Sequence, residues 1–266
     1  INYNNFMKLP LVSIIMNCHN GELYLRESLR SIFNQKYKNW ELIFWDNYSS
    51  DNSRKIIKKF KDKRIRYFYS KKFNSLYKSR NLAIGKAKGK YISFLDVDDK
   101  WGKDKLSLQV KKLEMYKGNF IYSNYYIENI SSKKIYKRKL SKLPEGKITQ
   151  ELLNDYFLGI LTVMMKRDIF KKFQFNKKYN IIGDFDFFIN LSQKYDFLCI
   201  QKPLSTFKLH YDNYSTKNLN EYYEEVKKWL KINNFKINKK FDLKNMKLIL
   251  FKLKLKKNLK LLRDFF

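Results

Sequence analysis

Short apolar runs alternate with longer amphipathic segments over the first 120 residues, and this alternation restricts the possible folds more than any other feature. The apolar runs lie at 11–17, 40–45, 64–69, 90–95 and 119–124. The amphipathic segments lie at 21–33, 51–60, 75–87 and 103–116. Short continuous apolar runs are typical of strands buried on both faces. Strands alternating with helices of about a dozen residues predict an α/β protein with a mostly parallel central sheet flanked by helices.

The second half of the chain has a less regular pattern. We expect an exposed basic loop at 130–148, a strand at 158–166 and a helix that begins at Asp184. Two further strands are expected at 196–200 and 204–210.

The charge of the chain favours anionic partners. The 57 Lys and Arg residues outnumber the 25 Asp and Glu residues, which gives a net charge of +32. Such a charge attracts nucleic acid, anionic lipid or phosphorylated substrates, although a base-composition bias in the coding DNA would also enrich lysine. The two cysteines, Cys18 and Cys199, form no disulfide framework or metal knuckle, so we expect a reducing compartment.

The sequence contains neither a signal-peptide pattern at its start nor an apolar run long enough for a membrane span. We therefore expect a cytoplasmic protein that meets a membrane, if at all, at the inner face of the cytoplasmic membrane.

Polar residues follow three of the predicted strands where each strand ends. They are Asn17 to Asn20 after the first strand, Asp46 and Asn47 after the second, and Asp96 to Asp99 after the fourth. Ligands of open α/β sheets bind beyond the carboxyl ends of the strands. The three clusters should therefore converge on one binding site.

Three carboxylates, those of Asp96, Asp98 and Asp99, crowd into four positions of this otherwise basic chain. Carboxylates so near one another raise each other's pKa unless a cation or hydrogen bonds offset the repulsion. Mg²⁺ typically takes one or two carboxylates together with substrate phosphates. The alternative is that the aspartates cap the helix near residue 103, but one Asp would suffice for that. The cluster thus predicts a DxD-type metal–phosphate site.

Four motifs in order resemble those of the family 2 glycosyltransferases, which have the GT-A fold. They lie in VSIIMNCHN, WELIFWDNYSSDNS and YKSRNLAIGKAKGKYISFLDVDD, and the resemblance covers residues 11–110, with a weaker match to about residue 215. It implies a Rossmann-like GT-A domain over residues 1–215, with a nucleotide-binding half at 10–120 and an acceptor-binding half at 121–215. It also implies metal-dependent, inverting transfer of a sugar from a nucleotide diphosphate.

The resemblance assigns residues to the nucleotide-sugar donor and to the metal. The donor-binding residues would be Asn17, His19, Asn20, Asp46, Arg80 and Asp96. Asp46 would accept a hydrogen bond from the imide N–H of uracil or its equivalent on another base. Arg80 would stabilise either the nucleotide or residues 96–99, which we call the acidic loop. Asp98, supported by Asp99, would bind Mg²⁺ or Mn²⁺. The chain departs from the family at Asn17, where proline is usual, and at His19, where an aromatic residue is usual.

The general base implied by the resemblance is Asp184 in IIGDFDFFINL, residues 181–191. Gly183 stands where the family commonly has Glu. Asp186 is the alternative base, and helix capping is the alternative role for Asp184. His210 could approach the metal or the leaving diphosphate, or pack at a strand end.

The chain is helical and basic beyond residue 216, and we expect residues 216–266 to form a basic amphipathic tail. Residues 221–266 contain 14 Lys and Arg residues against 5 Asp and Glu residues. Apolar residues recur at helical spacing at Leu248, Phe251, Leu255, Leu259, Leu262 and Phe266. A basic amphipathic helix is typical of a membrane-surface element. The same stripe could instead pack on the catalytic domain or on a second subunit.

The resemblance implies a UDP-sugar donor and a glycan or lipid-linked acceptor, in bacterial surface-polysaccharide synthesis, and no nucleic-acid partner. Two other functions fit parts of the pattern: a basic nucleic-acid-binding module and a nucleotidyltransferase. The products distinguish the three, because only sugar transfer releases a nucleoside diphosphate.

Overall fold

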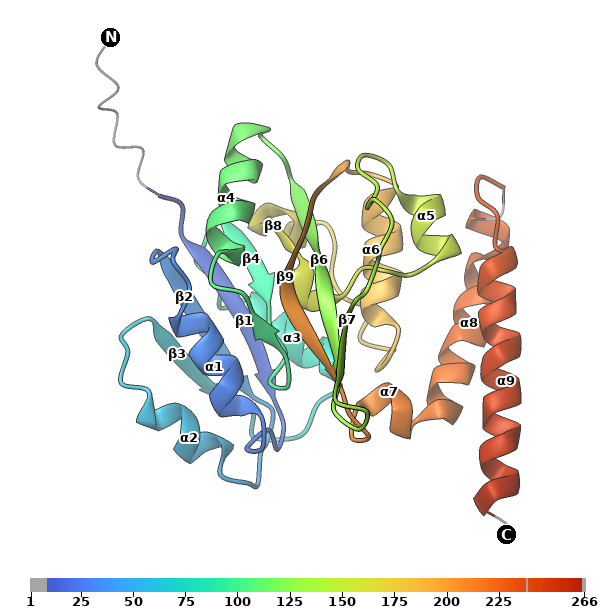
Figure 1. Cartoon of the computed structure of the whole chain (residues 1–266), viewed down its shortest axis with the longest axis horizontal. Helices are drawn as coiled ribbons and strands as arrows, with labels where there is room; N and C mark the ends of the chain where they lie inside the picture. Colours follow the sequence, from blue (N-terminus) through green and yellow to red (C-terminus); the bar gives the residue numbers. More distant parts are fainter. Residues whose placement is uncertain (1–8, 238, 265–266) are drawn as a thin grey trace.

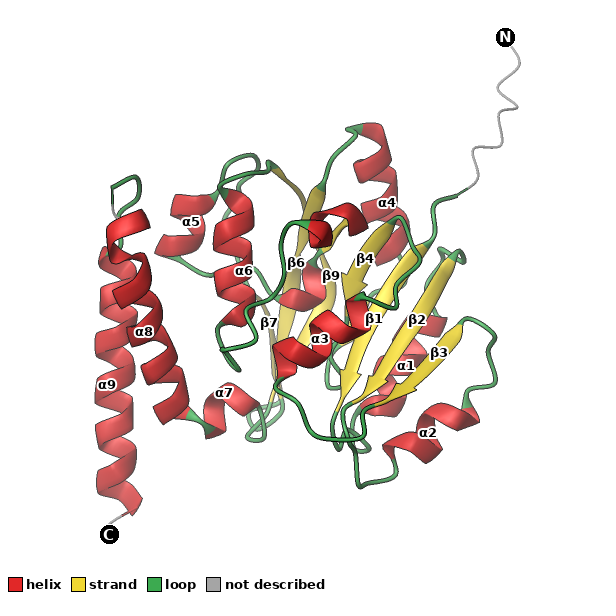
Figure 2. Ribbon diagram, turned by 180° about the vertical axis from the view of Figure 1, so that it is seen from behind, coloured by secondary structure: helices red, strands yellow, loops and turns green. Residues whose placement is uncertain are grey.

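The computed structural model describes residues 9–237 and 239–264, and its elements form one sheet with helices on both faces (Figures 1 and 2). The strands are β1 (Val12–Cys18), β2 (Trp40–Asp46), β3 (Ile65–Tyr69), β4 (Tyr91–Phe94), β5 (Lys100–Trp101), β6 (Phe120–Asn129), β7 (Lys134–Lys137), β8 (Met164–Lys166) and β9 (Phe197–Leu209). The α-helices are α1 (Leu25–Phe33), α2 (Ser53–Lys59), α3 (Leu76–Ile84), α4 (Lys105–Met115), α5 (Thr149–Asn154), α6 (Gly183–Ser192), α7 (Tyr214–Lys217), α8 (Leu219–Ile237) and α9 (Lys244–Asp264). Two 3₁₀ turns are η1 (Ile160–Thr162) and η2 (Arg167–Lys171).

The sheet has the order β3-β2-β1-β4-β8-β6-β9-β5, with β7 paired to β6. Strands β1 to β4 are parallel to one another, and β6 pairs with β9 in parallel. The short strands β5, β7 and β8 run antiparallel to their neighbours. The predicted α/β architecture with a mostly parallel sheet is therefore confirmed.

The predicted strands and helices of the first half all form, within a few residues of their expected ends, except that β6 continues five residues further, to Asn129. Every residue of β1 and β2 is buried, as their continuous apolar runs indicated. One core cluster contains side chains from α1, α2 and α4. The other contains side chains from α3, α5, α6, α8 and α9, so these two groups of helices cover opposite faces of the sheet (Figures 1 and 2).

Three predictions for the second half were wrong in part. The exposed loop expected at 130–148 contains β7, which forms a hairpin with β6, and two buried apolar residues, Leu143 and Ile148. The strand expected at 158–166 is reduced to the three residues of β8, because η1 precedes it. There the carbonyls of Leu161 and Val163 accept hydrogen bonds from side chains instead of from a strand.

The two strands expected at 196–200 and 204–210 are one strand, β9. The polar stretch Gln201-Lys202-Pro203 lies between the two expected strands, and proline cannot donate a ladder hydrogen bond. Its pairing with β6 instead shifts register around Asn124, opposite Pro203, and then continues to Leu209. The register shift accommodates proline without ending the strand.

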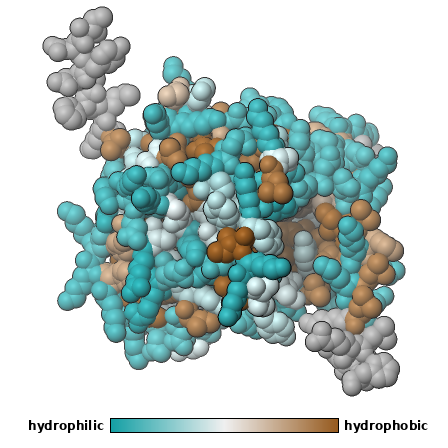
Figure 3. Space-filling view, viewed as in Figure 1, coloured by the Kyte–Doolittle hydropathy of each residue, from teal (hydrophilic) through white to brown (hydrophobic). Residues whose placement is uncertain are grey.

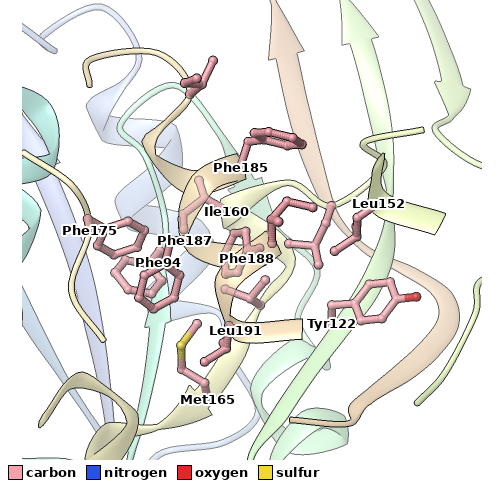
Figure 4. Close-up of a cluster of buried hydrophobic side chains, with 14 of the residues drawn as sticks. Phe94, Tyr122, Leu152, Ile160, Met165, Phe175, Phe185, Phe187, Phe188 and Leu191 are labelled. Atoms are coloured by element: carbon pink, nitrogen blue, oxygen red, sulfur yellow. The ribbon is translucent and has the colours of Figure 1, made fainter. Parts of the chain in front are cut away.

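An aromatic core fixes α6 against the sheet (Figure 4). The ring of Phe187 stacks on those of Phe170 and Phe175, with centroid distances of 5.6 and 4.3 Å. On another side of α6, the rings of Phe188 and Phe120 of β6 contact each other edge to face. Because aromatic side chains bury large areas, this packing holds the start of α6 in place.

The C-terminal extension forms two long helices beside α5 and α6 (Figure 1). Val226 and Trp229 of α8, and Met246 and Leu253 of α9, join the same core cluster as α6. The division at residue 215 stays a prediction. No helix in the described part of the chain is both long and apolar enough to span a bilayer. Of the predicted stripe, Phe266 and the side chain of Leu262 lie outside the described residues.

Candidate active site

The three polar clusters predicted at strand ends meet at one edge of the sheet. Cys18 and Asp46 are direct partners in the β1–β2 ladder, and the backbone N–H of Asn47 donates to the carbonyl of Cys18 at 2.7 Å. The acidic loop after β4 lies against the turn after β1. A Cβ atom on Gly21 would lie 3.0 Å from Cγ2 of Val97, so glycine permits this close approach.

Asn17 is buried at the end of β1, and neither its Nδ2 nor its Oδ1 has a hydrogen-bond partner among the described residues. Buried polar atoms are seldom left unpaired, so this amide is suited to a ligand. His19 is exposed nearby, with Nδ1 3.1 Å from the carbonyl of Asn47 and its ring 4.6 Å from that of Phe73. The side-chain Oδ1 of Asn20 accepts the N–H of Ser50 at 2.8 Å, which joins the turns after β1 and β2.

Asp46 is fully buried at the end of β2, and both of its carboxylate oxygens have donors. The hydroxyl of Tyr67 donates to Oδ2 at 2.7 Å, and the N–H of Ser49 donates to Oδ1 at 2.9 Å. In this arrangement Asp46 stabilises the turn that follows β2. The contact of Asp46 with a nucleotide base stays a prediction.

Arg80 lies between the acidic loop and α6. Its side chain is buried, and its Nη2 donates to Oδ1 of Asp96 at 2.9 Å. Its guanidinium also lies over the rings of Tyr77, Phe94 and Phe175. Burial would lower the pKa of Arg80, but the negative charges of neighbouring carboxylates, Asp96 first, raise it overall. Arg80 is therefore a fixed cation at the centre of the site.

Asp98 and His210 form a pair although they are 112 positions apart in the sequence. Nε2 of His210 lies 3.1 Å from Oδ2 of Asp98, and the amide of Asn213 lies 3.2 Å from the same ring nitrogen. The other ring nitrogen of His210, Nδ1, is buried without a hydrogen-bond partner among the described residues. The carboxylate of Asp98 is 24% exposed, so a ligand can reach it.

Asp99 points into the protein. Its Oδ1 accepts the backbone N–H of Lys208 at 3.1 Å, which ties the acidic loop to the strand that leads to His210. Burial raises the pKa of Asp99 well above its usual range, and the charges of Asp98 and Asp96 raise it further. A nearby cation would relieve this repulsion.

These residues fit a divalent cation that takes its remaining ligands from a substrate. No group of three or more His, Cys, Asp or Glu side chains within the described ranges is arranged to hold a metal. A carboxylate and an imidazole 3.1 Å apart can supply two ligands. Because Mg²⁺ is usually held by few protein oxygens plus substrate phosphates, such an incomplete set suits a nucleotide–metal complex.

Asp184, the proposed base, lies in the first turn of α6. The hydroxyl of Tyr77 lies 3.2 Å from its Oδ1, and the N–H of Phe185 donates to the same oxygen at 2.8 Å. Burial raises the pKa of Asp184, and the positive charge of Arg80 lowers it by less. A half-buried carboxylate with a raised pKa is suited to accept a proton.

The ring of Tyr77 also explains why glycine stands at position 183. A Cβ atom on Gly183 would lie 2.4 Å from the ring carbons of Tyr77. Any larger side chain there would displace the tyrosine that contacts Asp184. Glycine at position 183 therefore leaves room for the Tyr77 ring at the start of α6.

Asp186 points to a different part of the molecule. Its Oδ1 accepts a hydrogen bond from Nε1 of Trp229 at 2.9 Å, so α8 covers this carboxylate. The two aspartates are two residues apart, which separates their directions by about 200° around a helix. A role for Asp186 as the base stays a prediction, and its contacts are those of a residue that anchors α6 to α8.

Sequence reasoning missed Glu225 of α8. Its buried carboxylate accepts backbone N–H groups of Asn180, Ile181 and Ile182 at 2.5, 2.9 and 3.0 Å. These residues directly precede α6, so Glu225 positions the segment that carries Asp184. No local pattern identifies Glu225, because its partners lie more than forty positions away.

We expect Glu225→Gln to lower kcat by roughly 10- to 100-fold, because small displacements of catalytic groups cost that much. The amide would bring N–H donors against backbone N–H groups and should also cost about 1–3 kcal/mol of unfolding free energy. Steady-state kinetics and urea unfolding measure both effects. The control is Glu224→Gln, which removes the same charge from a neighbouring exposed residue. Equal kinetics in both variants would contradict the positioning role.

A family profile described as Glycosyl transferase family 2 matches residues 13–174. The chain belongs to this family. The resemblance inferred from the strand-end motifs is thereby confirmed, and the matched segment contains the acidic loop and Arg80 but ends before Asp184.

Two curated relatives support the assignment to glycosyl transferase family 2. One is named UDP-Glc:alpha-D-GlcNAc-diphosphoundecaprenol beta-1,3-glucosyltransferase WfgD, from Escherichia coli; it is 36% identical over 62% of this chain and 64% of its own. The other is named putative teichuronic acid biosynthesis glycosyltransferase TuaG, from Bacillus subtilis; it is 32% identical over 60% of this chain and 63% of its own. The chain spans less than two thirds of either relative.

The fold agrees with that of a solved mannosyltransferase structure. The mannosyltransferase PcManGT from Pyrobaculum calidifontis, in complex with GDP-Man and Mn²⁺, superposes with a TM-score of 0.62 over 86% of this chain and 65% of its own, at 16% identity. The predicted GT-A fold is therefore confirmed.

Proposed function

We propose that the chain is an inverting glycosyltransferase that moves a sugar from a nucleotide-diphosphate donor to a hydroxyl of a glycan or lipid-linked acceptor. One observation carries the proposal: Arg80 joins the acidic loop, through Asp96, to the neighbourhood of Asp184. Asp96, a candidate donor-binding group, and Asp184, a candidate base, thus both interact with one buried cation. An inverting displacement needs a leaving group on one side of the sugar and a base on the other.

Asp184 is the proposed general base. Its carboxylate would take the proton of the acceptor hydroxyl as the oxygen attacks the sugar, and its raised pKa makes it a better acceptor of that proton. The Tyr77 hydroxyl and the Phe185 N–H orient the carboxylate. Both donors contact the same oxygen, Oδ1.

Asp98 and His210 are the proposed ligands of Mg²⁺ or Mn²⁺. When bound there, the cation would offset the negative charge that develops on the leaving diphosphate. The Mn²⁺ named in the complex of PcManGT, a chain of the same fold, supports the use of a divalent cation. Asp99 keeps the two ligands together by binding the strand before His210.

Asn17, His19, Asn20 and Asp46 are the proposed surroundings of the nucleotide. The unpaired amide of Asn17 can donate to and accept from a base, and the exposed ring of His19 can stack on it. We propose a UDP-sugar donor, because the name of the relative WfgD gives UDP-Glc as its donor.

The proposed acceptor is lipid-linked and belongs to bacterial surface-polysaccharide synthesis. The relatives' names refer to a diphosphoundecaprenol-linked substrate and to teichuronic acid biosynthesis. Such an acceptor would place the enzyme in the cytoplasm at the inner face of the cytoplasmic membrane.

A donor panel tests this function. UDP-, GDP- and CMP-sugars are incubated with a GlcNAc-diphospholipid acceptor and Mn²⁺ or Mg²⁺, and the release of nucleotide is measured. We expect nucleoside diphosphate from a UDP-sugar, only with metal and acceptor. In a parallel incubation with a nucleoside triphosphate and a sugar 1-phosphate, pyrophosphate release would support a nucleotidyltransferase instead. Absence of metal-dependent donor binding by calorimetry would contradict the proposed donor site.

A further inference from the structure

Helix α9 has two apolar faces on opposite sides of its axis. Met246 and Leu253 are buried in the core shared with α8. Four large apolar side chains are exposed to 46–65%: Leu248, Phe251, Leu255 and Leu259. At about 100° per residue, these four lie opposite Met246 and Leu253. We call them the outer stripe, and packing within the chain therefore accounts for one face of α9 only.

Lysines border the outer stripe on both sides. Lys247 and Lys254 lie along one border, and Lys252 and Lys256 lie along the other; all four are exposed. The sequence of α9 contains seven Lys and one Arg against one Asp. Figure 3 shows hydrophobic and hydrophilic side chains side by side over α9, at the right edge of the view.

This combination of apolar and basic groups restricts the kind of partner that can bind the outer stripe. A second copy of the chain would bring another lysine-bordered helix against the first, and each copy carries +32. A nucleic acid would attract the lysines but leave the leucines and Phe251 in water. An anionic bilayer satisfies both, because apolar side chains enter the acyl boundary while lysines meet the headgroups.

We propose that the outer stripe of α9 and its bordering lysines bind the surface of an anionic bilayer, with the helix lying along the interface. The inner face meanwhile stays packed on α8, so the fold need not open. The proposal deepens the proposed function, on which it rests for the choice of a membrane. In Figures 1 and 2 the C-terminal end of α9 lies at the same end of the molecule as the carboxyl ends of β1 and β2. Bilayer binding would therefore bring the candidate site near a lipid-linked acceptor.

Flotation with vesicles tests the proposal without donor, acceptor or turnover, so its outcome is separate from that of the glycosyltransferase assay. The vesicles are phosphatidylcholine with or without phosphatidylglycerol. We expect the full chain to float only with phosphatidylglycerol, and less at high salt. Phe251→Ser with Leu255→Ser should lower the partition coefficient by about 10-fold or more. The control is Met115→Ser with Leu140→Ser, which changes two exposed apolar residues elsewhere and should bind normally.

A charge-matched pair of variants completes the test. Lys252, Lys254 and Lys256 are changed to Gln, and in the control Lys58, Lys59 and Lys61, exposed at the end of α2 and just beyond it, are changed to Gln. Both variants lose three charges, but only the first should lose about 10-fold or more in binding. Circular dichroism checks folding. Equal losses in both triple variants, binding to pure phosphatidylcholine, no vesicle binding, or a dimer dissociated by the stripe variant would each overturn the proposal.

Discussion

Asp184→Asn is expected to lower kcat by about 10²- to 10⁴-fold, the usual contribution of a general base. The amide keeps the size of the carboxylate and can still accept from the Tyr77 hydroxyl and the Phe185 N–H. It cannot take the acceptor proton. Donor affinity should change little, because Asp184 is assigned to the acceptor side.

The pH dependence of kcat distinguishes loss of the base from loss of structure. Asp184 must be unprotonated to act, and burial raises its pKa above that of an ordinary aspartate. Turnover should therefore fall as the pH is lowered through this raised pKa, and be full above it. The residual activity of Asp184→Asn should lack this acid limb.

Asp186→Asn is the matched control for Asp184→Asn, two positions along the same helix. Its carboxylate accepts from Trp229, so the change should affect stability more than turnover. Steady-state kinetics and calorimetry of donor binding are measured on both variants. If Asp186→Asn abolished turnover and Asp184→Asn did not, Asp186 would be the base.

Asp98→Asn is expected to reduce metal-dependent donor affinity by at least about 100-fold. Loss of residues that merely support metal ligands already costs 10- to 100-fold, so loss of a ligand should cost at least the larger value. Asp98 is the one carboxylate of the acidic loop whose oxygen faces both solvent and His210. Calorimetry of UDP binding with and without Mn²⁺ measures the effect.

The control for Asp98→Asn is Asp104→Asn, which removes a carboxylate of similar exposure paired with Lys36 just beyond the loop. It should leave donor binding unchanged. Persistence of metal-dependent UDP binding in Asp98→Asn would refute its assignment as a ligand. Equal losses in both variants would show that overall charge, and not coordination, had been measured.

Local sequence patterns predicted most of the first half because the interactions there are repetitive. Continuous apolar runs become β1 and β2 because a parallel sheet covered on both faces buries every side chain. The chain order of strands and helices then places all three polar clusters at the carboxyl edge. Where backbone groups bond to side chains, as at Leu161, the same kind of apolar run no longer predicts a strand.

By itself the sequence determined the α/β class, the family and the acidic loop, since each depends on residue types at short, regular spacings. Only the tertiary structure decided how distant residues meet. It placed Tyr77 where a side chain at Gly183 would lie, and Glu225 against the segment before α6. It also decided which apolar face of α9 is buried and which is exposed. These pairings join residues far apart in the chain, and helical or strand periodicity carries no information about contacts at that separation.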